Sequence, residues 1–224
     1  MDAVTIPIRL KYKRWLPYLA VLQTDIRQTL RSWVYRLWVL SMFLLGFGYL
    51  LYRLGVHREA GVIQEANLVM SDLLRWVVLG SAAVIAAITV GSISGERGTL
   101  ADSVLSRGIS RYQYFLAKWH SRVLSVVGTF VILSSAMLVA SHFLLHENLS
   151  FTGSIAALTL VSSIFFVVAS AGVTLSGLTN DSRVAMTIVW LALYGGGALL
   201  ELLPSHHPTP DRILRQLPAT LRGE

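Results

Sequence analysis

Residues 91–122 read GSISGERGTLADSVLSRGISRYQYFLAKWHSR and form a long polar interruption between two apolar runs. The run at 76–95 holds 20 residues without a charge, and the run at 123–146 holds 24. A helix rises about 1.5 Å per residue, so about 20 apolar residues cross a hydrocarbon layer of roughly 30 Å. We therefore expect two membrane-spanning helices joined by a polar segment that lies outside the membrane.

Working outward from this stretch, the apolar runs predict an all-α integral membrane protein with five spans. The spans are expected at about 33–54, 76–95, 123–146, 152–178 and 184–203. The first has 16 uncharged residues between Arg36 and Arg53, whose long side chains can reach the membrane surface. A charge at the bilayer centre costs about 2.5–3.5 kcal/mol or more, so charge-free windows of this length are strong indicators of spans.

The composition argues against a soluble α-helical domain, which is the simplest alternative. The chain is 54% hydrophobic and only 14% charged, whereas a typical soluble domain is about 25% charged. With so few charges, a globule of 224 residues could not hide this much apolar surface. The absence of cysteine excludes disulfides and thiolate chemistry.

No catalytic or metal-binding constellation is visible, and we expect no cofactor on this chain. His142 and His146 are four residues apart, but without a third ligand nearby an interfacial pair is the better interpretation. No glycine-rich GxxxxGK[ST] loop that could hold ATP is present. No basic and aromatic face suggests nucleic-acid binding.

The distribution of lysine and arginine predicts the orientation. If the spans alternate, thirteen of the 19 basic residues lie on the side of the N-terminus and the central loop. The N-terminus and the loop 96–122 are therefore expected in the cytoplasm. Residues 55–74, the turn near 147–150 and the tail 204–224 are expected on the outer side.

Residues 1–32 are interpreted as a cytoplasmic lead followed by an amphipathic helix at the membrane interface. Apolar side chains recur at spacings of three and four between Trp15 and Trp33, with arginines largely on the other side. The residues expected to hold this helix at the interface are Trp15, Leu19, Leu22, Ile26, Arg27 and Arg31.

Small residues are frequent in the second and fourth spans, for example Ala86, Gly91, Gly172 and Ser176. Such residues let helix backbones approach closely in lipid. The glycines at 195–197 in the fifth span could mark a flexible or broken point, although close packing is the simpler explanation.

The central loop has a helical pattern of its own. Glu96 lies where a helix would start, and a negative side chain stabilises the positive N-terminal end of a helix dipole. Leu100, Val104 and Leu105 would form a short apolar face. Such a helix at the cytoplasmic surface should dock into a partner, and the alternative is a helix lying on lipid headgroups.

This loop resembles the coupling-helix signature of the type-2 ABC permease family. The matching residues are Glu96, Arg97, Gly98, Thr99, Leu100, Leu105, Ser106, Ile109, Ser110, Arg111, Leu116, Ala117 and Lys118. The closest subgroup is that of short export permeases similar to the nitrous-oxide-reductase maturation permease, and the N-terminal helix is similar to the interfacial elbow helix of that family. Family members often have proline where this chain has Gly108, and they have six spans where five are expected here.

The resemblance implies the permease subunit of an ATP-driven ABC transporter, an exporter in a bacterial or archaeal plasma (inner) membrane. ATP and Mg would be bound by a separate ABC ATPase subunit, and a second permease copy or a paralogue would complete a dimer. The residues implied in coupling to the ATPase are Glu96, Gly98, Thr99, Leu100, Val104, Leu105, Ser110 and Arg111. The alternative function is a non-transporting membrane scaffold or assembly factor, and a membrane enzyme is a more distant third.

Overall fold

The computed structural model describes residues 15–60, 66–96, 109–145, 150–196 and 214–223, and these contain helices but no strands. The elements in chain order are α1 (Leu16–Arg31), α2 (Trp33–Ala60), α3 (Ala66–Ser94), α5 (Arg111–Leu145), α6 (Phe151–Leu178), α7 (Ser182–Trp190), the π-helical turn η1 (Leu191–Gly195) and α10 (Leu217–Arg222).

Four helices are long and apolar enough to cross a membrane, which confirms the membrane character of the chain. They are Trp33–Val56, Asn67–Ser94, Arg111–Phe143 and Phe151–Leu178, and they match the first four predicted spans. The expected fifth span at 184–203 is described only to residue 196. Its described part is a shorter apolar helix, Ser182–Gly195.

Two helices begin well before the spans expected from the sequence. The second span was expected from residue 76, but α3 begins at Ala66; the third was expected from 123, but α5 begins at Arg111. A charge-free window measures the hydrocarbon layer, whereas the backbone hydrogen bonds of a helix continue beyond it. The segment between α3 and α5 is therefore shorter than the loop 96–122 that the sequence suggested.

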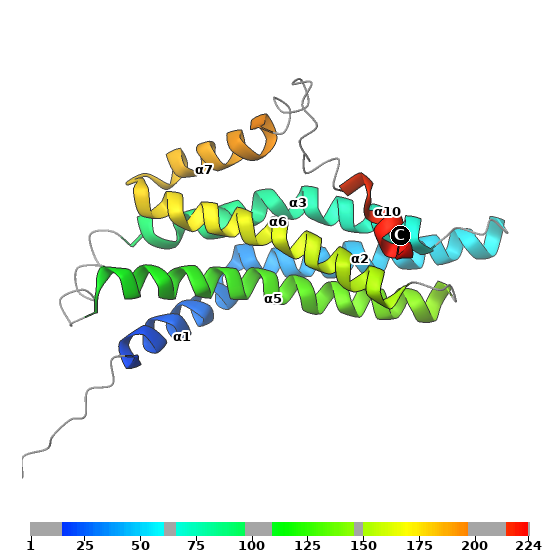
Figure 1. Ribbon diagram of the computed structural model, residues 1–224, viewed down its shortest axis with the longest axis horizontal. Helices are drawn as coiled ribbons and strands as arrows, with labels where there is room; N and C mark the ends of the chain where they lie inside the picture. The colour runs from blue at the N-terminus through cyan, green and yellow to red at the C-terminus, as the bar shows by residue number, and fades with distance from the viewer. Residues whose placement is uncertain (1–14, 61–65, 97–108, 146–149, 197–213, 224) are drawn as a thin grey trace, which may run out of the picture.

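The long helices lie side by side and alternate in direction, and α7 runs along the outside of the bundle (Figure 1). α3 is the central helix: 61% of its most apolar window is buried, against 17% for α2. Much of α2 therefore presents apolar side chains outward, as expected for a helix in contact with lipid. α1 and the C-terminal α10 lie at opposite ends of the bundle (Figure 1).

The most extensive contact between long helices is that of α3 and α6. A Cβ atom built on Gly172 would lie only 2.0 Å from Thr89 Oγ1, so glycine is required there. One turn further, Ser176 Oγ accepts hydrogen bonds from the backbone N–H groups of Ile93 and Ser94 at 2.9 and 3.0 Å. Gly172 and Ser176 thus have the close-packing role expected of small residues, whereas Gly91 is exposed.

The short helix α10 is seated on the first turn of α6. Its side chains Leu217 and Leu221 are fully buried, and Leu214 just before it is buried as well. Gly153 of α6 makes this contact possible, because a Cβ there would lie 2.3 Å from the carbonyl oxygen of Thr220. The sequence did not predict this element, since the tail was interpreted only as an outward-facing segment.

Replacing Gly153 with alanine should loosen α10, because the added methyl group meets backbone atoms that cannot rotate away. We expect a loss of about 1 kcal/mol, the low end of the range for overpacking. Amide hydrogen exchange should rise at residues 217–222 and stay unchanged in α5. Unchanged exchange at α10 would contradict the seating described here.

Candidate functional site

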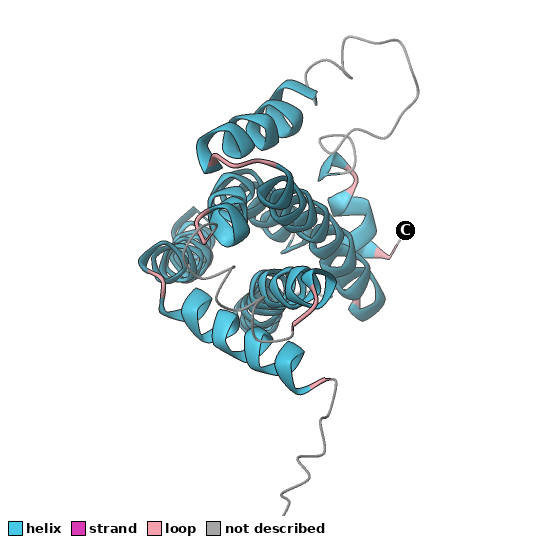
Figure 2. Ribbon diagram, turned by 90° about the vertical axis from the view of Figure 1, so that its left-hand side faces the viewer, coloured by secondary structure: helices cyan, strands magenta, loops and turns pink. Residues whose placement is uncertain are grey.

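The helix α1 crosses the end of the bundle obliquely and packs against α5 (Figure 2). It starts at Leu16, with Pro17 in the first turn, where a missing N–H costs nothing. The two residues of α1 that are buried are both polar: Asp25 is 2% exposed and Thr29 is fully buried. Thr29 Oγ1 donates a hydrogen bond to the backbone carbonyl of Asp25 at 2.8 Å, which satisfies the hydroxyl and leaves the carboxylate as the buried charge.

The opposing face of α5 carries three polar side chains four residues apart, Tyr114, Lys118 and Arg122. Side chains at this spacing lie on one side of a helix. The start of α5 is fixed by a reciprocal cap. Ser110 Oγ accepts the N–H of Gln113 at 3.1 Å, and Gln113 Oε1 accepts the N–H of Ser110 at 3.3 Å.

These side chains meet Asp25 and Glu96 in a buried ion cluster, a name kept below for Asp25, Glu96, Tyr114, Lys118 and Arg122. Lys118 Nζ lies 2.6 Å from Asp25 Oδ1 and 2.6 Å from Glu96 Oε1. Arg122 donates to Asp25 Oδ1 at 3.3 Å. Tyr114 donates its hydroxyl proton to Glu96 Oε2 at 2.6 Å. Lys118 therefore bridges α1 and the end of α3 through one ammonium group.

The ion cluster is balanced, with two carboxylates and two cations. Balance matters because the side chains of Asp25 and Lys118 are only 1% and 4% exposed, so neither charge is hydrated by bulk water. Desolvating a pair of charges offsets much of their attraction, but leaving one of them unpaired costs several kcal/mol. The ion cluster therefore adds little net stability, but it specifies the position of α1 on α5, because any other position would leave a buried charge unpaired.

Two buried polar atoms of the ion cluster lack a hydrogen-bond partner among the described residues. They are Asp25 Oδ2 and Arg122 Nε. Buried polar atoms of this kind are commonly satisfied by ordered water.

The residues expected to form the interfacial helix lie on two different sides of α1. Trp15 and Leu19 are 72% and 52% exposed, and Leu22 and Ile26 are half-buried against the bundle. The arginines at 27 and 31 are exposed. The helix thus has an apolar flank free to contact lipid, a basic flank, and a third flank, not anticipated, that holds the buried Asp25.

The residues expected to couple to an ATPase are only partly described. Glu96 contacts Lys118 and Tyr114 and is 15% exposed at its side chain, so it faces the protein rather than a partner. Ser110 caps α5, and Arg111 is exposed in its first turn. The remaining coupling candidates lie outside the described residues: Gly98, Thr99, Leu100, Val104 and Leu105.

Sequence reasoning missed most of the ion cluster. Lys118 was noted as a basic residue of the loop and as part of the family resemblance, Arg122 only as a basic residue of the loop, and Asp25 and Tyr114 were not singled out. The available signal was the repeat of Tyr, Lys and Arg every four residues, which marks a polar helix face continuing into an apolar span. Its partner on α1 could not be inferred because the contact joins residues 93 positions apart.

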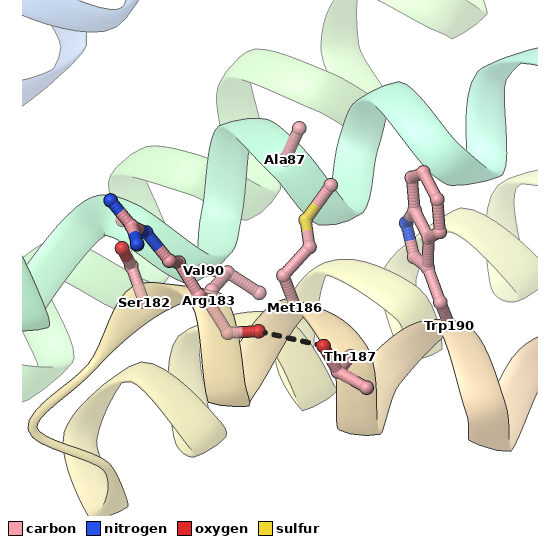
Figure 3. A pocket seen from close by; sticks show the side chains of 8 residues that line it. Ala87, Val90, Ser182, Arg183, Met186, Thr187 and Trp190 are labelled. Carbon is pink, nitrogen blue, oxygen red and sulfur yellow. Dashed lines mark hydrogen bonds between the residues drawn. The ribbon is translucent and has the colours of Figure 1, made fainter.

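A second feature is an open cleft of about 440 Å³ between α3 and α7 (Figure 3). Val90 and Gly91 of α3 form one wall, and α7 lines the other with a row that starts at Arg183 and ends at Trp190. The cleft lies near the same end of the bundle as the ion cluster. α7 begins at the end of the bundle where α6 and α3 end, and Glu96 of the ion cluster lies in the turn that follows α3 (Figure 1).

No protein-family model, curated protein or solved structure matches this chain.

Proposed function

We propose that this chain is the membrane-spanning permease subunit of an ATP-driven ABC transporter, most simply an exporter. ATP and Mg are bound by a separate ATPase subunit, and a second permease copy or a paralogue completes the assembly. The N-terminus and the segment 97–110 face the cytoplasm of a bacterial or archaeal cell. The proposal combines the coupling-helix resemblance of that segment with the way its two ends are anchored.

The anchoring is the observation that supports the proposal best. The segment begins directly after Glu96, in the turn that follows α3, and enters α5 at the cap formed by Ser110. Glu96 is bonded to Lys118, and Lys118 is bonded to Asp25 of α1. A displacement of the segment is therefore delivered to α1, α3 and α5 together, through contacts of 2.6 Å.

Such a joint suits a subunit that converts closure of an ATPase into a rigid-body motion of helices. A loosely attached loop would absorb the displacement within itself. Here Glu96 orients the segment from inside the protein, while Leu100 and Val104 are the apolar anchors toward the ATPase. Arg111, exposed at the start of α5, provides a charged contact beside them.

Replacing Leu100 with aspartate should weaken binding to the ATPase at least tenfold, because it places a charge in an apolar docking face. Binding is measured by co-purification with an ABC ATPase subunit co-expressed with this chain, and coupling by ATP hydrolysis with and without the permease in lipid. The matched control is Asp102→Asn, which changes the charge by one unit on the opposite side of the expected helix.

Equal ATPase recovery with the wild type and Leu100→Asp would refute the coupling assignment. A chain that binds no ATPase and leaves its hydrolysis rate unchanged would instead favour a membrane scaffold or assembly factor.

A further inference from the structure

We propose that the cleft between α3 and α7 binds one anionic phospholipid of the surrounding bilayer. This inference is independent of the transporter proposal, because it requires only that the chain lies in a membrane. It assigns a use to Arg183, which the buried ion cluster does not involve.

The cleft is polar at one end and apolar at the other. Arg183 and Ser182 stand at its entrance, at the start of α7 (Figure 3). Met186 and Trp190 follow along the same side of α7, and Ala87 faces them from α3. Arg183 and Trp190 are seven positions apart in the helix, which corresponds to roughly 10 Å along the axis. A ligand that fills the cleft must therefore have a charged head and an apolar tail.

The polarity of the cleft has the same direction as that of a lipid leaflet. α3 carries no charge between Arg75 and Glu96, so these two residues mark the ends of its apolar stretch. Gly91 lies five residues inward from Glu96, roughly 8 Å at the rise of a helix. Arg183 opposite it can extend its guanidinium to headgroup depth, while Trp190 lies deeper among the acyl chains.

The charge of Arg183 selects the headgroup. The described residues contain no salt bridge to its guanidinium, and α3 presents no acidic side chain along the cleft. Guanidinium groups match the geometry of phosphate oxygens with two parallel hydrogen bonds. The nearest acidic residue in sequence is Asp181. Its carboxylate caps α7 by accepting a hydrogen bond from the backbone N–H of Arg183, not from the guanidinium, at 2.8 Å.

The cleft is reachable from the side of the bundle. Arg183, Thr187 and Trp190 are all exposed on α7, and Ala87 and Gly91 are exposed on α3. Its volume of about 440 Å³ is within the range of roughly 300–1,000 Å³ typical of ligand pockets. The π-helical turn η1, which continues α7, is held to α3 by a hydrogen bond from the Tyr194 hydroxyl to the carbonyl of Leu79 at 3.2 Å. The lipid therefore fills a gap that the two helices leave open.

The test measures quenching of Trp190 by lipids with dibrominated acyl chains in nanodiscs containing the full chain. The chain has 6 tryptophans, so the Trp190 signal is the difference between the wild type and Trp190→Phe. Phosphatidylglycerol should quench Trp190 at about fivefold lower mole fraction than phosphatidylcholine with the same chains, the preference expected from one interfacial arginine.

Arg183→Gln should abolish this preference, and Arg183→Lys should keep most of it. Arg111→Gln, which removes an exposed arginine from α5, should leave it unchanged. Equal quenching by the two lipids in the wild type would overturn the proposal, as would a preference that survives in Arg183→Gln. Absence of Trp190 quenching by either lipid would also overturn it and would indicate that a second copy of the chain covers the cleft.

Discussion

Replacing Lys118 with methionine is expected to lower the free energy of unfolding by about 3–5 kcal/mol, the cost of leaving a buried charge without its partner. Lys118 is 4% exposed and bonds to Asp25 and Glu96 at 2.6 Å each. Without it, two carboxylates at the end of the bundle share the single cation of Arg122. Methionine keeps the length and flexibility of the lysine side chain, so the loss reports the charge rather than a cavity.

The measurement is urea-induced unfolding in mild detergent, followed by helical circular dichroism. The control is Arg111→Met on the same helix, where the arginine is exposed and the change should be below about 0.5 kcal/mol. Adding Asp25→Asn to Lys118→Met restores the charge balance, so about 1 kcal/mol or more of the loss should return. Equal stability of Lys118→Met and the wild type would show that α1 is not held by the ion cluster.

Gly172→Val is the second substitution for which we expect a large loss, about 3 kcal/mol, at the upper end of the usual cost of overpacking. A Cβ at this position would lie 2.0 Å from Thr89 Oγ1 and 2.9 Å from Thr89 Cβ. Thr89 cannot rotate away freely, because its hydroxyl donates to the carbonyl of Ile85 at 2.8 Å. The helices α3 and α6 must therefore separate.

The same unfolding measurement tests this second expectation. Gly128→Val is the matched control, because a Cβ on Gly128 has no neighbouring atom within 4 Å. Thr89→Ala should restore part of the stability of Gly172→Val by removing the hydroxyl that is nearest to the new side chain. If Gly128→Val and Gly172→Val were equally destabilised, helix propensity rather than interhelical contact would be responsible.

The membrane helices could be predicted because their signal is local. A run of 20 uncharged residues such as 76–95 has few structural interpretations, and the 3–4 spacing of apolar residues from Trp15 onward reveals α1 without any knowledge of its neighbours. The ends were less predictable. α3 extends back to Ala66 because helical hydrogen bonding continues where the apolar sequence has stopped.

The ion cluster could not be predicted because it depends on which helices are neighbours. Asp25 sits within an amphipathic pattern, where a lone acid is ordinarily interpreted as part of the solvated side. Only the packing of α1 on α5 turns it inward, and only the short turn after α3 brings Glu96 within reach of Lys118. The same limitation applies to α10. The burial of Leu217 and Leu221 in α10, and of Leu214 just before it, depends on the close approach that Gly153 of α6 allows.

The distance in sequence between Asp25 and Lys118 also sets an order of events during synthesis. Lys118 is made 93 residues after Asp25, which corresponds to roughly 5–20 s at about 5–20 residues per second. During that interval the first helix carries an acid whose partners do not yet exist. The buried contact between α1 and α5 can therefore form only after the third long helix has been made. Closing the joint is thus a late step of assembly, and a chain stalled before Lys118 would display an undocked first helix to the quality-control proteases of the cell.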